Sequence, residues 1–163
     1  MNSLTVAGAF EIGGLPLHPL IVHLVVVLTP LTALALVLSV FWPAARRRLA
    51  IVTPLAALFV LILVPITVAA GESLKEVVGP LPAVERHETW GRMLLPWAIA
   101  LFVVAAAQWA WYRFGRAGVV EERPSLARVT EVVLGVLAIG VSIGTIVMIV
   151  LIGDSGARAV WGS

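Results

Sequence analysis

The sequence predicts an all-α integral membrane protein, a polytopic bundle of four transmembrane helices. Hydrophobic residues make up 61% of the 163-residue chain and charged residues 12%, whereas soluble domains are roughly 45–50% apolar and about 25% charged. A soluble fold of this size could not bury so much apolar surface, but a bilayer can solvate it. Four separate apolar stretches, each as long as a membrane-crossing helix, supply the predicted spans.

Each predicted span is a run of about 20 apolar residues with no charged residue in its interior, which is the length that a helix needs to cross the hydrocarbon core. No Lys or Arg precedes Arg46, so the first stretch lacks the basic region of a secretory signal peptide and is interpreted as an uncleaved span. Polar connectors join the spans into one integral membrane domain, residues 1–163. The spans are expected at residues 19–41, 49–70, 93–111 and 132–152.

The distribution of Lys and Arg predicts the orientation. The first and third connectors hold seven arginines, and the opposite side holds four Lys or Arg. Because cytoplasmic loops carry the excess of basic residues, both termini are expected outside the cytoplasm. The preference for Arg over Lys is typical of a high-GC bacterium, so the predicted location is the bacterial cytoplasmic (inner) membrane. The seven arginines are Arg46, Arg47, Arg48, Arg113, Arg116, Arg123 and Arg128.

The candidate site is a polar cluster at the extracytoplasmic ends of the spans. It includes every histidine and the only aspartate of the chain: His18, His23, His87 and Asp154. Ionisable groups at the edge of an apolar bundle are costly to hold without partners, so their presence together points to a site. The other members of the cluster are Glu72, Glu76, Glu88, Arg92 and Arg158.

The spacing of the histidines predicts ligands from two helices. His18 and His23 are five residues apart, which in a helix means about 140° of rotation and about 7.5 Å of rise. They cannot flank one haem, so His23 and His87 are predicted as inner ligands of haem b. Alternatively, His18, His23 and His87, with Asp154 or a glutamate, could close around a non-haem Zn, Fe or Mn ion. The chain has no Cys, which excludes a thiolate site.

The polar cluster also allows an interpretation without any cofactor. Histidines at helix ends often only contact backbone carbonyls or carboxylates, so a protein without any cofactor is the alternative.

Gly153-Asp154-Ser155-Gly156 looks like a serine-hydrolase nucleophile motif but lacks its structural context. Gly153 is instead expected to end the fourth helix, and no independent catalytic activity is predicted. No charge lies inside a span, which disfavours a solute carrier.

Two further segments carry structural expectations. Residues 71–78 alternate apolar and charged side chains at helical spacing, which predicts a short interfacial helix over the outer mouth of the bundle. Gly140 and Gly144 form a Gly-x-x-x-Gly pair in the fourth span. Such pairs allow close helix packing, chiefly within the chain, with a homodimer as the other interpretation.

The segment from His18 to His23, His-Pro-Leu-Ile-Val-His, together with the four-span hydropathy, resembles a bacterial membrane family. It is filed as domain-of-unknown-function family twenty-two thirty-one, and its first helix opens with a His-Pro-x-x-x-His motif. The resemblance implies a histidine ahead of the third span, matched by His87. It also implies a Gly-His-x-Gly element after the fourth span, where this chain has Asp154 in place of the histidine. Relatives joined to Rieske-type iron–sulfur domains imply redox chemistry by association.

The predicted function is therefore that of a small membrane protein which binds haem b or a non-haem transition metal for electron transfer. His18 and Asp154 would be third and fourth ligands or would support the ligands His23 and His87. The expected partners are the lipid bilayer and a redox partner or membrane complex, and no nucleic acid is indicated. The alternative is a structural or accessory subunit, free of cofactor, that docks an extracytoplasmic partner.

Overall fold

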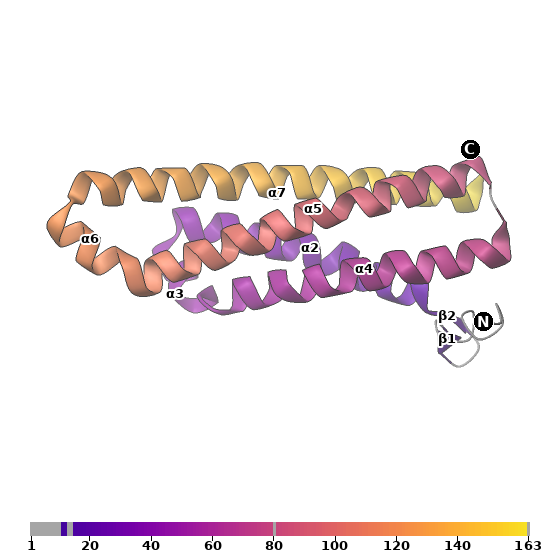
Figure 1. Cartoon of the computed structure of the whole chain (residues 1–163), viewed down its shortest axis with the longest axis horizontal. Coiled ribbons are helices and arrows are strands. Elements are labelled where there is room, and N and C mark those ends of the chain that lie inside the picture. The colour runs from indigo at the N-terminus through magenta and orange to yellow at the C-terminus, as the bar shows by residue number, and fades with distance from the viewer. Residues whose placement is uncertain (1–10, 13–14, 80, 163) are drawn as a thin grey trace.

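Four long helices form an antiparallel bundle, as Figure 1 shows. The computed structural model describes residues 11–12, 15–79 and 81–162. All four helices include a segment long and apolar enough to cross a bilayer. The predicted all-helical, four-span architecture is thus confirmed, and the protein is a multi-pass membrane protein. The long helices are α2 (Leu17–Phe41), α4 (Val52–Val78), α5 (Pro82–Ala110) and α7 (Pro124–Trp161).

Shorter elements complete the described chain. A π-helical turn, η2 (Trp111–Gly115), links α5 to α6 (Arg116–Glu122), and α3 (Pro43–Leu49) links α2 to α4. Two short antiparallel strands, β1 (Glu11–Ile12) and β2 (Leu15–Pro16), precede α2. Pro43, Pro82 and Pro124 each occupy the first turn of a helix, where the missing N–H of proline costs nothing.

The helices extend well beyond the predicted spans on one side of the bundle. The prediction of a separate interfacial helix over residues 71–78 is wrong, because this segment forms the last two turns of α4. The fourth helix likewise does not end at Gly153 but continues to Trp161. Each helix ends at a glycine with positive φ, Gly79 at 93° and Gly162 at 68°. Residues other than glycine rarely adopt this conformation.

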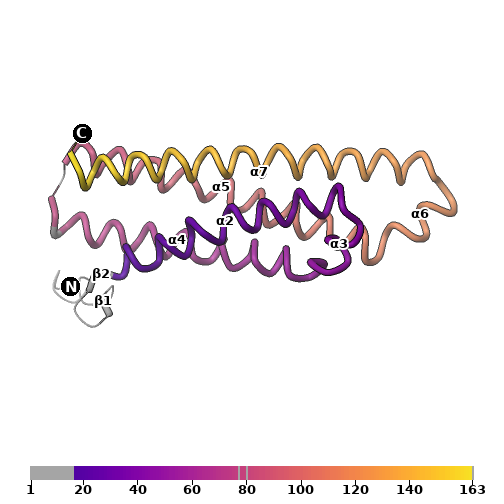
Figure 2. The backbone as a smooth tube through the Cα atoms, turned by 180° about the vertical axis from the view of Figure 1, so that it is seen from behind, coloured from indigo at the N-terminus to yellow at the C-terminus, as the bar shows by residue number. Residues whose placement is uncertain are grey.

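The long helices pack in a ring. The main contacts join α2 to α4, α4 to α5, α5 to α7 and α7 to α2. Consequently α2 and α5 stand on one diagonal of the bundle, and α4 and α7 stand on the other. The two views of the backbone in Figures 1 and 2 agree with this arrangement.

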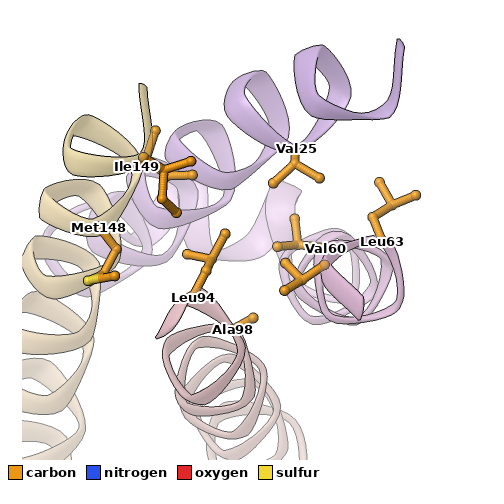
Figure 3. Close-up of a cluster of buried hydrophobic side chains, with 9 residues drawn as sticks. Val25, Val60, Leu63, Leu94, Ala98, Met148 and Ile149 are labelled. Carbon is orange, nitrogen blue, oxygen red and sulfur yellow. The ribbon is translucent and has the colours of Figure 1, made fainter. Parts of the chain in front are cut away.

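Apolar side chains from all four long helices fill the interior. One core cluster joins Val25, Val64, Leu94 and Ile149 from the four helices in turn, and Figure 3 shows its members pointing toward one another. A second cluster lies further along the bundle around Leu36 and its neighbours. Many apolar side chains on the outside of the helices are exposed, as expected for a surface that faces lipid.

Most hydroxyl side chains inside the spans donate a hydrogen bond within their own helix, whereas the buried Thr29 Oγ1 has no partner among the described residues. Thr32, Ser39, Thr67 and Thr145 each donate a hydrogen bond to the carbonyl oxygen four residues earlier. One serine instead bridges two helices, because Ser142 Oγ on α7 donates to the Ala33 carbonyl of α2 at 3.2 Å.

The Gly-x-x-x-Gly pair has two different environments. A Cβ at Gly144 would lie 1.9 Å from Trp97 Cζ3, so the indole ring of α5 packs directly on this glycine. Gly140 is exposed, and a Cβ there would meet no atom within 4 Å. Gly144 therefore serves packing within the chain. A homodimer through Gly140 remains a prediction.

The two ends of the bundle differ in the charged and titratable side chains that they carry. The start of α2, the α4–α5 connection and the end of α7 lie together (Figures 1 and 2); we call this the histidine end because His18, His23 and His87 belong to it. The opposite end carries α3, η2 and α6 with the seven predicted loop arginines; we call it the arginine end.

Candidate functional site

A cavity of about 490 Å³ opens between the four long helices at the histidine end. Its lining is mostly apolar, and its inner wall includes core residues such as Val25, Leu94 and Ile149. All three histidines of the chain contribute to it. A cavity of this size is typical of a binding site for a cofactor or another small molecule.

His18 enters the cavity from the first turn of α2 and is held by α4. Its Nδ1 lies 2.9 Å from the carbonyl oxygen of Thr67. The ring rests on Gly71, where a Cβ would come within 3.0 Å of His18 Cε1. A side chain at position 71 would push the imidazole back by a few tenths of an ångström from the carbonyl of the preceding helical turn.

His87 is held in the same way by α7. Its Nδ1 lies 3.2 Å from the carbonyl oxygen of Ile152, and the ring rests on Gly156, where a Cβ would come within 3.1 Å of His87 Cε1. Ser155 Oγ also lies 3.2 Å from Nδ1. That hydroxyl donates to the Ile152 carbonyl at 3.0 Å, an arrangement that orients the imidazole and does not make an activated nucleophile.

The two histidines thus occupy equivalent half-sites. In each, the imidazole bonds the carbonyl of one helical residue and packs on a glycine four residues later. A carbonyl oxygen can only accept, so each Nδ1 carries a proton and donates it. The ring centroids of His18 and His87 are 6.1 Å apart, with the ring planes at 84°. Two imidazoles from diagonally opposite helices therefore meet, and neither Nε2 atom forms a hydrogen bond with a residue that the structure describes.

The other two predicted ligands are placed differently. His23 lines the same cavity, but it is exposed and its Nδ1 bonds the carbonyl of Pro19 in its own helix. Asp154 is exposed and accepts two hydrogen bonds from Arg158, at 3.0 and 3.1 Å. It is not among the residues that line the cavity. In the described part of the chain, no three His, Cys, Asp or Glu side chains form a group able to hold a metal ion.

An ion-pair network borders the cavity between α4 and α5. Lys75 Nζ contacts Glu88 at 2.8 Å, and Arg92 contacts Glu88 at 2.6 Å and Glu72 at 2.9 Å. Lys75 and Glu88 also line the cavity. The network joins the charged extensions of α4 and α5 beyond the apolar spans.

Sequence reasoning found the histidines but missed the groups that orient them. These are backbone carbonyls and glycines, which carry no chemical signature in a single sequence. The Gly153-Asp154-Ser155-Gly156 segment was a partial signal, because Ser155 and Gly156 both contact His87. The missed residues are Thr67, Gly71, Ile152, Ser155 and Gly156.

Comparison with known proteins identifies the family of the chain. The family model described as Predicted membrane protein (DUF2231) matches residues 14–163. The chain belongs to this family. Searches of the curated proteins and of the solved structures return no match. The family match covers both half-sites, so the resemblance that the sequence suggested is confirmed at the level of the family, whose description names no activity.

Proposed function

We propose that this DUF2231 protein binds haem b between His18 and His87 and carries electrons at the histidine end of the bundle. The observation that carries the proposal is the pair of equivalent half-sites. Histidines that ligate a metal almost always donate their second ring N–H to a carbonyl or carboxylate, which fixes the tautomer and the ring orientation. Both imidazoles here have that bond.

The ring separation favours ligands on opposite sides of one metal. An imidazole whose nitrogen lies about 2.0–2.1 Å from a metal has its ring centroid about 3.2 Å from that metal. The centroids of two such rings would then be about 6.4 Å apart on opposite sides of the metal and about 5.2 Å apart at a tetrahedral angle. The observed 6.1 Å is nearer the trans value. Haem needs only two protein ligands, which also agrees with a site where two histidines meet.

In this proposal the residues of the chain bind and orient the group. His18 and His87 would hold the metal, and the apolar lining around Val25, Leu94 and Ile149 would exclude water from the bound group. Lys75 at the cavity edge is a cation suited to a propionate. A haem with two axial histidines supplies a one-electron couple with no open coordination position, which suits electron transfer.

The histidine end is proposed to face away from the cytoplasm. Support comes from the arginines, because the seven in the first and third connectors all belong to the opposite end of the bundle. An electron donor or acceptor would then approach from the extracytoplasmic side, where the cavity opens.

The test is the visible spectrum of the protein purified in mild detergent from cells supplied with haem precursor. We expect a Soret band, a sharp α band on reduction and about one haem per chain. His18→Ala and His87→Ala should each abolish the spectrum, and the matched variant His23→Ala should retain it.

Other outcomes would contradict the proposal. A colourless preparation with stoichiometric Fe, Mn or Zn that requires His23 would favour the non-haem site. A colourless, metal-free preparation that does not bind added haemin, in a protein whose His18→Ala and His87→Ala variants fold normally, would leave the accessory subunit as the function.

A further inference from the structure

A second cavity, at the arginine end, has the chemistry of an anion site. It measures about 590 Å³ and lies between α3, the ends of α2 and α5, and the η2–α6 turn. Four arginines line it: Arg46, Arg47, Arg113 and Arg116. We define this cavity with its four guanidinium groups as the arginine pocket.

The pocket has an excess of positive charge. Arg116 pairs with Glu131 at 2.7 Å. Arg46, Arg47 and Arg113 form no ion pair with any carboxylate in the described ranges, 11–12, 15–79 and 81–162. Guanidinium groups gathered without carboxylates repel one another, and an anion that bridges them relieves this repulsion.

The wall of the pocket also contains a buried amide without a partner. Gln108 on α5 is only 5% exposed and lines the pocket. Its side chain forms no hydrogen bond within the part of the chain that the structure describes. Because no hydrogen bond to the described residues occupies this amide, it is available to a polar ligand in the pocket.

The local backbone positions these donors. The π-helical turn η2 interrupts the regular helix directly after α5, and such turns frequently occur at functional sites. It places Arg113 beside the pocket together with Tyr112, whose ring packs under the guanidinium of Arg46 at 3.9 Å. This cation–π contact holds Arg46 at the pocket without neutralising it.

We propose that the arginine pocket binds a phosphate group, carried either by an anionic phospholipid or by a free phosphate compound. Arginine forks match phosphate oxygens with paired hydrogen bonds, and basic pockets between membrane helices are suited to lipid headgroups. The proposal is independent of haem binding, because the arginine pocket and the histidine cavity lie at opposite ends of the bundle.

The experiment compares two triple variants of equal charge. One is Arg46→Gln/Arg47→Gln/Arg113→Gln in the pocket. The matched control is Arg48→Gln/Arg123→Gln/Arg128→Gln, which changes exposed arginines at the same end that do not line the pocket. Binding of phosphatidylglycerol, phosphatidylcholine and inorganic phosphate to the full chain in detergent is measured by native mass spectrometry and calorimetry. Gln108→Ala and Arg47→Gln serve as single variants.

For the wild type we expect binding of phosphatidylglycerol, of inorganic phosphate or of both, and little binding of phosphatidylcholine. Each arginine is expected to contribute about fivefold to the affinity for the phosphate group, so the pocket triple should lower this affinity about 100-fold. The control triple should change the affinity by less than about threefold. Phosphatidylglycerol binding that phosphate cannot displace identifies the lipid, and displacement identifies the phosphate group alone. If the pocket triple does not fold, the two single variants must still weaken binding.

Equal loss in the two triples would overturn the proposal, since it would reveal only general surface attraction. Absence of binding by the wild type to both probes would overturn it as well, as would single variants that bind like the wild type.

Discussion

Gly156→Ala tests the half-site geometry without removing either histidine. A Cβ at this position would lie 3.1 Å from His87 Cε1 and 3.2 Å from Nδ1, whereas nonbonded carbon atoms prefer about 3.5–4.0 Å. The imidazole must then retreat by about 0.3–0.5 Å, and its hydrogen bond to Ile152, already 3.2 Å long, weakens. Metal–ligand distances tolerate only about 0.2 Å.

Losing a group that orients a metal-binding histidine typically lowers metal affinity about 10–100-fold. We therefore expect Gly156→Ala to bind haem about 10–100 times more weakly than the wild type. Gly71→Ala should act similarly through His18, because its Cβ would come 3.0 Å from that ring. Affinity is measured by haemin titration of the haem-free protein, followed at the Soret band.

The matched control is Gly140→Ala, on the same helix but exposed and without an atom within 4 Å of the added methyl group. It should leave haem affinity unchanged and stabilise α7 by about 0.5–1 kcal/mol. Haem affinity at the wild-type level in Gly156→Ala, alongside its loss in His87→Ala, would refute the claim that the glycine positions the ligand.

Three further results are expected. Gly144→Ala places a methyl group 1.9 Å from the Trp97 ring and should destabilise the bundle by about 1–3 kcal/mol, measured by denaturant unfolding against Gly140→Ala; equal stability of the two variants would contradict the packing. Ser142→Ala removes the only side-chain hydrogen bond between α7 and α2 among the described residues and should cost about 0.6 kcal/mol in the same assay. Since the chain has no cysteine, Glu85→Cys should react with an impermeant maleimide in intact cells and Arg48→Cys only after permeabilisation; the reverse pattern would invert the proposed orientation.

The spans could be predicted from the sequence because lipid imposes a simple rule of length and apolarity. The helix ends could not, since they depend on contacts between helices. Lys75 and Glu88 belong to segments that hydropathy assigns to a polar connector, yet they pair at 2.8 Å across α4 and α5. That pair joins the two charged extensions, and His87 lies next to Glu88 in the sequence and lines the cavity.

The site was predictable in part for a related reason. The few ionisable side chains at these span ends lie at one end of the bundle, so the proximity of His18 and His87 could be predicted from the sequence. The placement of Asp154 was not, because its partner Arg158 lies one turn further along a helix that was expected to have ended. The roles of Gly71 and Gly156 could not be predicted either, because each glycine matters only by leaving space for an imidazole from a distant part of the sequence.

The equivalence of the two half-sites links the site to the assembly of the bundle. His18 is oriented by α4 and His87 by α7, while α2 and α5 stand on one diagonal. Neither helix pair alone can bring two imidazoles together, so the cavity exists only when both pairs have packed. A group bound by both rings would then stabilise the packed bundle over its separated pairs by mass action. Under the haem proposal, removing that group should loosen the histidine end more than the arginine end, where the ion-paired and aromatic contacts around Arg46 and Arg116 do not involve it.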